Sequence, residues 1–141
     1  MRRAAAVLVL AGCLESIGPE VGPPQAARCA EADTDPGSDV SFVRDIVPIL
    51  TDKCYVCHKP GGFGFAVARL DLTSYAALRA GGATAGGDIV LPGTPCSSIL
   101  WQKLSEGPPF GARMPLNGPP FLTDDQISLI HDWIAEGAGA E

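Results

Sequence analysis

The sequence has few of the side chains on which many functional sites depend. It contains only two His and two Met, and aromatic residues make up 6% of its 141 positions. Charged residues make up 18%, with 10 Lys and Arg against 16 Asp and Glu and a net charge of −6. This acidic balance lacks the basic footprint of a nucleic-acid-binding protein, so we expect no nucleic acid as a partner. Because His and Met are scarce, a site that needs either of them has few candidates.

Residues that favour turns and loops are abundant instead. The chain has 17 Gly and 13 Pro, which predicts long loops between few regular elements. Hydrophobic residues reach 46%. That fraction is typical of a globular domain and excludes a disordered chain, and the length suits one domain with short extensions.

The first residues are typical of an export signal. Arg2 and Arg3 precede an uncharged apolar run over residues 4–12, which is shorter than the roughly 20 residues of a bilayer-spanning helix. The run ends in the sequence LAGC, which resembles the bacterial lipobox with Cys13 as the lipidated residue. We predict that residues 1–12 are a lipoprotein signal peptide, and that lipid on Cys13 holds the exported protein at a membrane, on its periplasmic or cell-surface side. A plain signal peptide with an incidental cysteine is the alternative.

The next segment differs from the rest of the chain. Residues 13–38 have no apolar periodicity and are rich in Pro, Gly, Ala and acidic residues. We interpret them as the lipid anchor and a flexible tether, and we place the folded domain at residues 39–141. A loop packed on the domain surface is the alternative, and Cys29 could dock part of it. Loss of the signal peptide removes two arginines and changes the net charge from −6 to −8.

Apolar spacing and capping residues predict four modest helices in the domain. They cover residues 41–53, with a kink at Pro48, and residues 74–80, 94–106 and 123–136. No stretch alternates as a β-strand does. The fold class is therefore all-α with long Gly/Pro-rich loops, and the helices alone make so thin a core that we expect another group at its centre.

The spacing of three residues suggests that this group is haem. Cys54, Cys57 and His58 form a C-x-x-C-H motif, which is typical of covalent c-type haem attachment. Two thiols separated by two residues reach the two vinyl groups on one edge of the porphyrin, and the adjoining imidazole binds the iron. We therefore predict one haem c, with Cys54 and Cys57 as thioether links and His58 as an axial iron ligand.

Three other interpretations of the motif stay open at this point. A thioredoxin-like redox pair requires a βαβ setting, which the sequence does not indicate. A structural zinc site requires four ligands, and only Cys29, Cys96 or His131 could complete one, at spacings unlike known zinc modules. The third alternative is an incidental disulfide.

Two cysteines remain after the lipidated residue and the haem pair. In an oxidising compartment Cys29 and Cys96 are candidates for a disulfide, which would close a loop of 68 residues and pin the tether to the domain. Two separate thiols are the alternative, because sequence does not show proximity.

A second axial ligand is predicted from the scarcity of methionine. Met114 is the only Met left after removal of the signal peptide, and it lies in a Gly/Pro-rich loop at residues 107–120. A thioether on such a loop can approach the open face of the iron, and Met/His ligation suits electron transfer. The alternatives are a space-filling Met and His131 as the rival ligand. For His131 itself, the simpler interpretation is a half-exposed residue at a helix edge.

Four segments in this order resemble small mono-haem class I cytochrome c domains, particularly the planctomycete-type and related bacterial forms. The segments are IVPIL at 46–50, the haem motif at 54–58, LPGTP with Ser98 and Leu100 at 91–100, and RMP at 113–115 followed by Leu122 to Ala138. The resemblance implies an all-α fold wrapped around haem, His58 and Met114 as axial ligands, and electron transfer as the activity. Leu116 stands where such domains often carry a second Pro, and Cys96 is not part of the shared pattern.

The expected function is that of a membrane-tethered carrier of single electrons, without substrate turnover of its own. The acidic chain predicts a redox partner with a basic docking surface. The alternatives are a haem-based sensor or enzyme subunit with an open or His-ligated iron, and a thiol oxidoreductase that uses Cys54 and Cys57.

Overall fold

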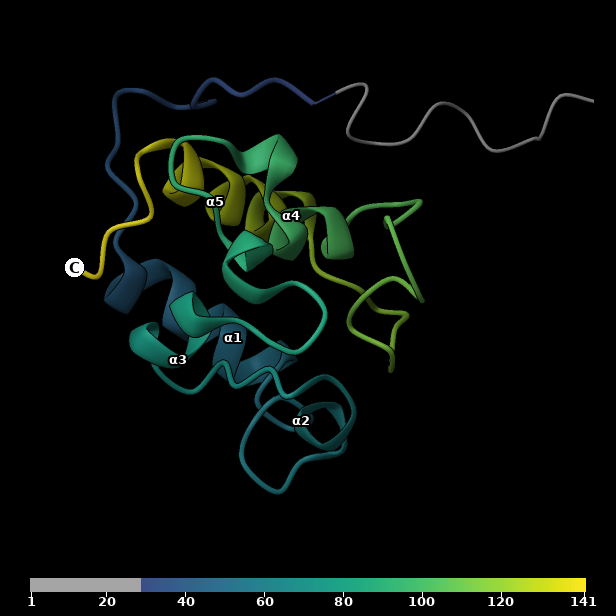
Figure 1. The fold of residues 1–141 in the computed structure, drawn as a ribbon. Helices are drawn as coiled ribbons and strands as arrows, with labels where there is room; N and C mark the ends of the chain where they lie inside the picture. Colours follow the sequence, from purple (N-terminus) through teal and green to yellow (C-terminus); the bar gives the residue numbers. More distant parts are fainter. Residues whose placement is uncertain (1–28) are drawn as a thin grey trace, which may run out of the picture.

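The computed structural model describes residues 29–141 (Figure 1). The predicted signal peptide, Cys13 and most of the tether lie outside these residues. Within them the chain forms five α-helices and three short helical turns and contains no β-strand, as expected of an all-α protein. The elements are η2 (Phe42–Ile46), α1 (Val47–Lys53), α2 (Phe63–Ala68), α3 (Tyr75–Ala80), η3 (Gly86–Ile89), η4 (Pro95–Ser97), α4 (Ile99–Leu104) and α5 (Asp124–Ala135). None of the helices in this part of the chain is long and apolar enough to cross a membrane.

The first helical segment changes its winding near Pro48. Ser41 caps η2, a π-helix, by accepting a hydrogen bond from the Arg44 backbone N–H. The Val47 N–H still donates to the Phe42 carbonyl, and the α-helical pattern of α1 begins there, with Pro48 in its first turn. Proline has no N–H to donate, so it fits best in a first turn. The irregularity expected at Pro48 is therefore a junction between two helix types.

Two predicted helices are confirmed with their caps. Ser74 caps α3 through the Ala77 N–H. Thr123 and Gln126 form a reciprocal capping box at the start of α5. These helices were predictable because the signals that start them are local in sequence.

The helix expected at residues 94–106 is divided into two. η4 ends at Ser97, Ser98 is extended, and α4 then runs to Leu104. The Ser98 hydroxyl is buried and accepts a hydrogen bond from the Leu91 N–H at 2.8 Å. The extended Ser98 thus supplies a partner for a part-buried N–H seven residues earlier, which would otherwise lose a hydrogen bond on folding.

Two elements were not predicted. α2 has Gly62 at its N-cap without a side-chain hydrogen bond, and none of its residues is buried. η3 occupies the Gly-rich stretch that the sequence indicates as a surface loop. Neither has a capping side chain or an apolar stripe, which are the signals on which sequence reasoning depends.

The core is centred on α5, which packs against η2, η4 and α4 (Figure 1). Trp133 is buried with its ring centroid 5.3 Å from that of Phe42, and Tyr75 meets Phe42 edge-on. The Phe42 N–H donates to the Glu141 carbonyl at 2.6 Å, so the C-terminal end of the chain returns to the start of the domain. Trp101 is also buried, as expected of a core aromatic.

The last part of the predicted tether, residues 29–38, lies within the described residues and is held on the domain surface. A disulfide joins Cys29 to Cys96. Thr34 hydrogen-bonds to Asp132, and the Val40 N–H donates to Glu136 at 2.8 Å. We call residues 29–40 the strap, because these contacts fix them along α5.

Candidate functional site

Two adjoining apolar cavities bring the predicted site residues together. The larger, of about 310 Å³, is lined by Cys54, His58 and Met114. The smaller, of about 110 Å³, is lined by all four residues Cys54, Cys57, His58 and Met114. The volume of the larger cavity and the apolar walls of both suit a small-molecule or cofactor site. Val67 and Leu116 line both cavities.

The backbone after α1 places the motif at the cavity wall. The Cys54 N–H still donates to Leu50, and the His58 N–H donates to the Cys54 carbonyl at 2.9 Å, so the motif continues as a helical turn. The Phe65 N–H donates to the Cys57 carbonyl at 3.0 Å and ties α2 to the motif. One turn therefore delivers both thiols and the imidazole to the same cavity.

His58 is available as a ligand. Its Nδ1 is buried and has no hydrogen-bond partner among the described residues. Burial lowers the pKa of the imidazole, which favours the neutral form that binds metals. An orphaned, neutral imidazole nitrogen beside an apolar cavity fits a group that supplies iron.

The Cys54 thiol is not activated as a nucleophile. Burial raises its pKa to about 12, with a smaller contribution from the nearby carboxylate of Asp52. Catalytic and redox cysteines have a lowered pKa, because the thiolate is the reactive form. Burial therefore favours the protonated form of the Cys54 thiol.

Hydrogen bonds from α4 hold the loop that carries Met114. The Met114 N–H donates to the Lys103 carbonyl at 2.8 Å, and Lys103 Nζ donates to the carbonyls of Phe110 and Ala112 at 2.6 Å each. Arg113 Nε donates to the Leu104 carbonyl at 2.7 Å. The loop at residues 107–117 is thereby fixed to α4, with the Met114 side chain at the cavity.

Lys103 was missed by sequence reasoning. It lines the larger cavity, and burial lowers its pKa. Its signal in the sequence is a lysine within the apolar stripe of a short helix, between Leu100 and Leu104. That position is a sign of a lysine whose stem packs on apolar residues while its ammonium group reaches polar partners.

Large apolar side chains stand exposed around the cavities. Val67 is 69% and Leu116 58% exposed, and Phe63 and Phe110, also exposed, line one cavity each. A cluster of exposed apolar groups at a cavity marks a surface that a ligand or a partner covers. The residues present therefore fit a flat, largely apolar cofactor such as haem.

The rival ligand His131 lies outside this site. It lines neither cavity, is only 5% exposed, and hydrogen-bonds to Asp132 and to the Ala30 carbonyl. The expectation that His131 is half-exposed is wrong, because the strap covers it. Among the described residues, the one cluster of three metal-ligating side chains is Cys29, Cys96 and His131, without either cysteine of the motif.

Comparisons of the chain with protein-family models, curated proteins and solved structures gave no match.

Proposed function

We propose that this protein is a c-type cytochrome that carries single electrons. The observation that carries the proposal is that Cys54, Cys57, His58 and Met114 line one apolar cavity. Cys54, Cys57 and His58 are close because they are neighbours in the sequence. Met114, in contrast, comes from a loop 56 positions after His58. A shared cavity is what a haem held by these four residues requires.

Each residue has a distinct role in this proposal. Cys54 and Cys57 would hold the haem through thioether links, which would leave neither residue with a free thiol. His58 and Met114 would bind its iron, and a thioether ligand would favour a higher reduction potential. Bound haem supplies reversible one-electron chemistry at its iron, and the apolar walls exclude water from it.

The N-terminal features extend the proposal to location and partners. A signal peptide over residues 1–12 and lipid on Cys13 would place the protein outside the cytoplasm at a membrane surface. The net charge of −6 favours a redox partner with a basic docking surface, through long-range attraction. Cys13→Ser, expressed with the same signal, should release the protein from the membrane fraction.

The test of the haem proposal is an absorption spectrum. The protein is matured in a periplasm with haem-ligation machinery and recorded oxidised and reduced, then extracted with acid and acetone. We expect haem to stay with the protein, and the weak far-red band of Met-ligated ferric haem to disappear in Met114→Ala. Leu116→Ala is the matched control, since it trims the same cavity without removing a ligand.

Other results point to the rival functions. Retained haem without the far-red band in the wild type would favour an open or differently ligated iron, and hence a sensor or an enzyme subunit. Extraction of all haem would refute covalent attachment, and Cys54 and Cys57 would then be tested as a redox pair.

A further inference from the structure

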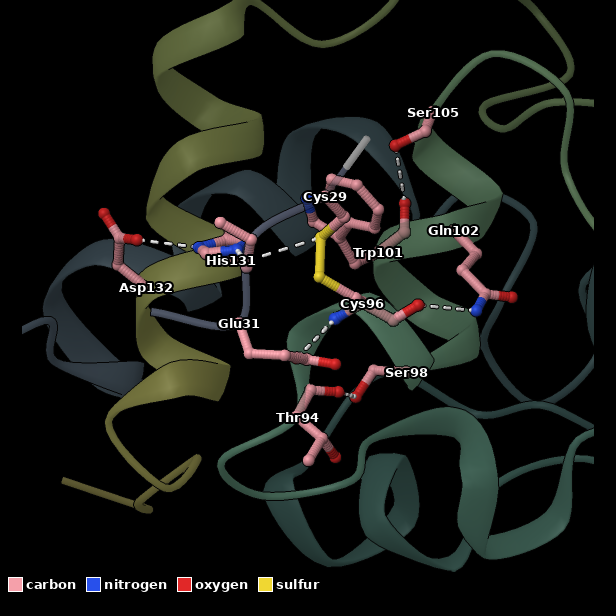
Figure 2. The surroundings of a disulfide bond; sticks show 11 residues. Cys29, Glu31, Thr94, Cys96, Ser98, Trp101, Gln102, Ser105, His131 and Asp132 are labelled. Carbon is pink, nitrogen blue, oxygen red and sulfur yellow. Dashed lines mark hydrogen bonds and ion pairs between the residues drawn. A yellow bond between two sulfur atoms is a disulfide. The ribbon is translucent and has the colours of Figure 1, made fainter. Parts of the chain in front are cut away.

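The disulfide lies beside a buried histidine, on the side of α4 away from the cavities. The sulfur atoms of Cys29 and Cys96 and a ring nitrogen of His131 lie within 4.8 Å of one another (Figure 2). None of the three residues lines either cavity. Trp101 of α4 faces His131, with 5.8 Å between ring centroids.

His131 is oriented in the way that metal-binding histidines are. Its Nδ1 lies 2.8 Å from Asp132 Oδ1, and Asp132 in turn accepts hydrogen bonds from the Thr34 N–H at 2.9 Å and the Thr34 hydroxyl at 2.6 Å. A carboxylate on one ring nitrogen fixes the ring and leaves the other nitrogen for a metal. The other nitrogen, Nε2, here lies 2.7 Å from the carbonyl of Ala30, the residue that follows Cys29 on the strap.

We propose that reduction of the Cys29–Cys96 disulfide turns this cluster into a zinc(II) site, with two thiolates and His131 Nε2 as protein ligands. Two cysteines and one histidine with an open fourth position form a known type of zinc donor set. Glu31 lies near the cluster, since its carboxylate accepts a hydrogen bond from the Cys96 N–H at 3.1 Å, but it is not one of the three clustered residues. The disulfide and the metal exclude each other, so the site is controlled by redox state.

The chemistry requires a dithiol reductant. A small dithiol gives two electrons and two protons to the disulfide, which yields the thiols of Cys29 and Cys96 and leaves the reductant as a cyclic disulfide. Zinc then displaces one proton from each thiol, and His131 Nε2 exchanges the Ala30 carbonyl for the metal, releasing any proton it carries. The proposal does not depend on haem, because it uses neither Cys54 nor Cys57.

The experiment uses the full chain after haem attachment, in which Cys54 and Cys57 are blocked as thioethers. The protein is treated with dithiothreitol, freed of it without oxygen, and incubated with ZnCl2 and a chromophoric zinc chelator. Metal per chain is measured after gel filtration. We expect about one zinc per reduced chain, none on the oxidised chain, and release on reoxidation. The double variant Cys29→Ser/Cys96→Ser should bind none.

Asp132→Asn, compared with a control that removes a carboxylate elsewhere, tests whether Asp132 positions the His131 ring or acts only through its negative charge. It keeps the size of the side chain but weakens the acceptor for Nδ1–H, so zinc affinity should fall about 10- to 100-fold. His131→Gln should lower it at least as far. Asp88→Asn is the control, since Asp88 is exposed on η3 and carries none of the strap contacts. The helical circular dichroism of each variant shows whether it is folded.

Two results would overturn the proposal. One is a reduced chain whose two thiols titrate but which takes up no zinc against the chelator. The other is zinc binding that His131→Gln leaves unchanged. With Cys13 lipidated, a chain that carries no haem shows four titratable thiols instead of two, which refutes the proposed function. The zinc test is then made with Cys54→Ala/Cys57→Ala, so the two failures are distinguishable.

Discussion

Gly64 shows how a single residue without a side chain positions the imidazole. A Cβ built at this position would lie 2.9 Å from Cε1 and 3.1 Å from Nδ1 of His58, and 3.1 Å from the Cys57 carbonyl oxygen. Such distances are too short for an unstrained contact, and the carbonyl belongs to backbone that cannot turn aside. The sequence did not indicate this role, because the closeness of α2 to the motif is a tertiary feature.

Gly64→Ala should therefore displace the ring of His58. We expect a lower yield of haem-loaded protein and a changed spectrum of the reduced form. Gly87→Ala is the control, because a Cβ there meets nothing within 4 Å. The comparison is made on the haem-to-protein ratio after purification, and equal ratios in the two variants would contradict the assigned contact.

Asp132 gives a pH dependence that can be measured. Burial raises the pKa of its carboxyl, but hydrogen bonds from Thr34 and His131 outweigh burial and hold the pKa below its ordinary value. The folded state then binds fewer protons than the unfolded state, so this stabilisation is present above the ordinary pKa and is lost as pH falls through the folded value. We expect the free energy of unfolding to decrease below about pH 4.

Thr34→Val tests this assignment, because it keeps the shape and the backbone N–H but removes the hydroxyl donor. Urea unfolding at neutral and at acid pH should show a smaller loss of stability in the variant. Thr73→Val is the control, since its hydroxyl makes a similar bond to Asp71. A pH dependence identical to that of the wild type would show that the Thr34 hydroxyl does not stabilise the carboxylate.

At the scale of the elements, α4 supports the Met114 loop as well as the cavity wall. Lys103→Leu keeps an apolar stem but removes the two hydrogen bonds from the ammonium group to the loop carbonyls. The loop should then release Met114 more easily, so the far-red band should be lost at lower temperature than in the wild type. Lys59→Leu, at an exposed position, serves as the control. If the far-red bands of the wild type and of the Lys103 variant are lost at the same temperature, Lys103 has no role in holding the loop.

The elements also show what the sequence can predict. α5 and α3 start at capping side chains within a few residues of their first turn, so local chemistry determines them. α2 has no such signal, and the break before α4 depends on a hydrogen bond to Leu91, seven residues away. Residue type and spacing predicted Cys54, Cys57, His58 and Met114 as members of one site, and they do line one cavity. The position of Lys103 and the contacts of His131 depend on tertiary packing.

At the scale of the whole molecule, the disulfide between Cys29 and Cys96 links the strap to the helices. Closing a loop of 68 residues restricts the unfolded chain and stabilises the fold by about 4 kcal/mol in the chain-entropy description. Cys29→Ser/Cys96→Ser should lower the free energy of unfolding by about this amount or less, measured by urea titration of haem-loaded protein. Its far-red band should persist at room temperature, since neither cysteine lines the cavities.

The same bond has a mechanical consequence. A force applied between the two ends of the chain is transmitted from Cys29 directly to Cys96 through the disulfide. The segment between these residues, including Cys54, Cys57 and His58, lies inside a closed covalent loop, so its backbone cannot be drawn out between the two ends while the disulfide is intact. Only the part after Cys96, which includes Met114, can be extended in this way. In the proposed cytochrome, a force on the two ends could therefore lengthen the chain that carries Met114 but not the chain that carries the haem motif.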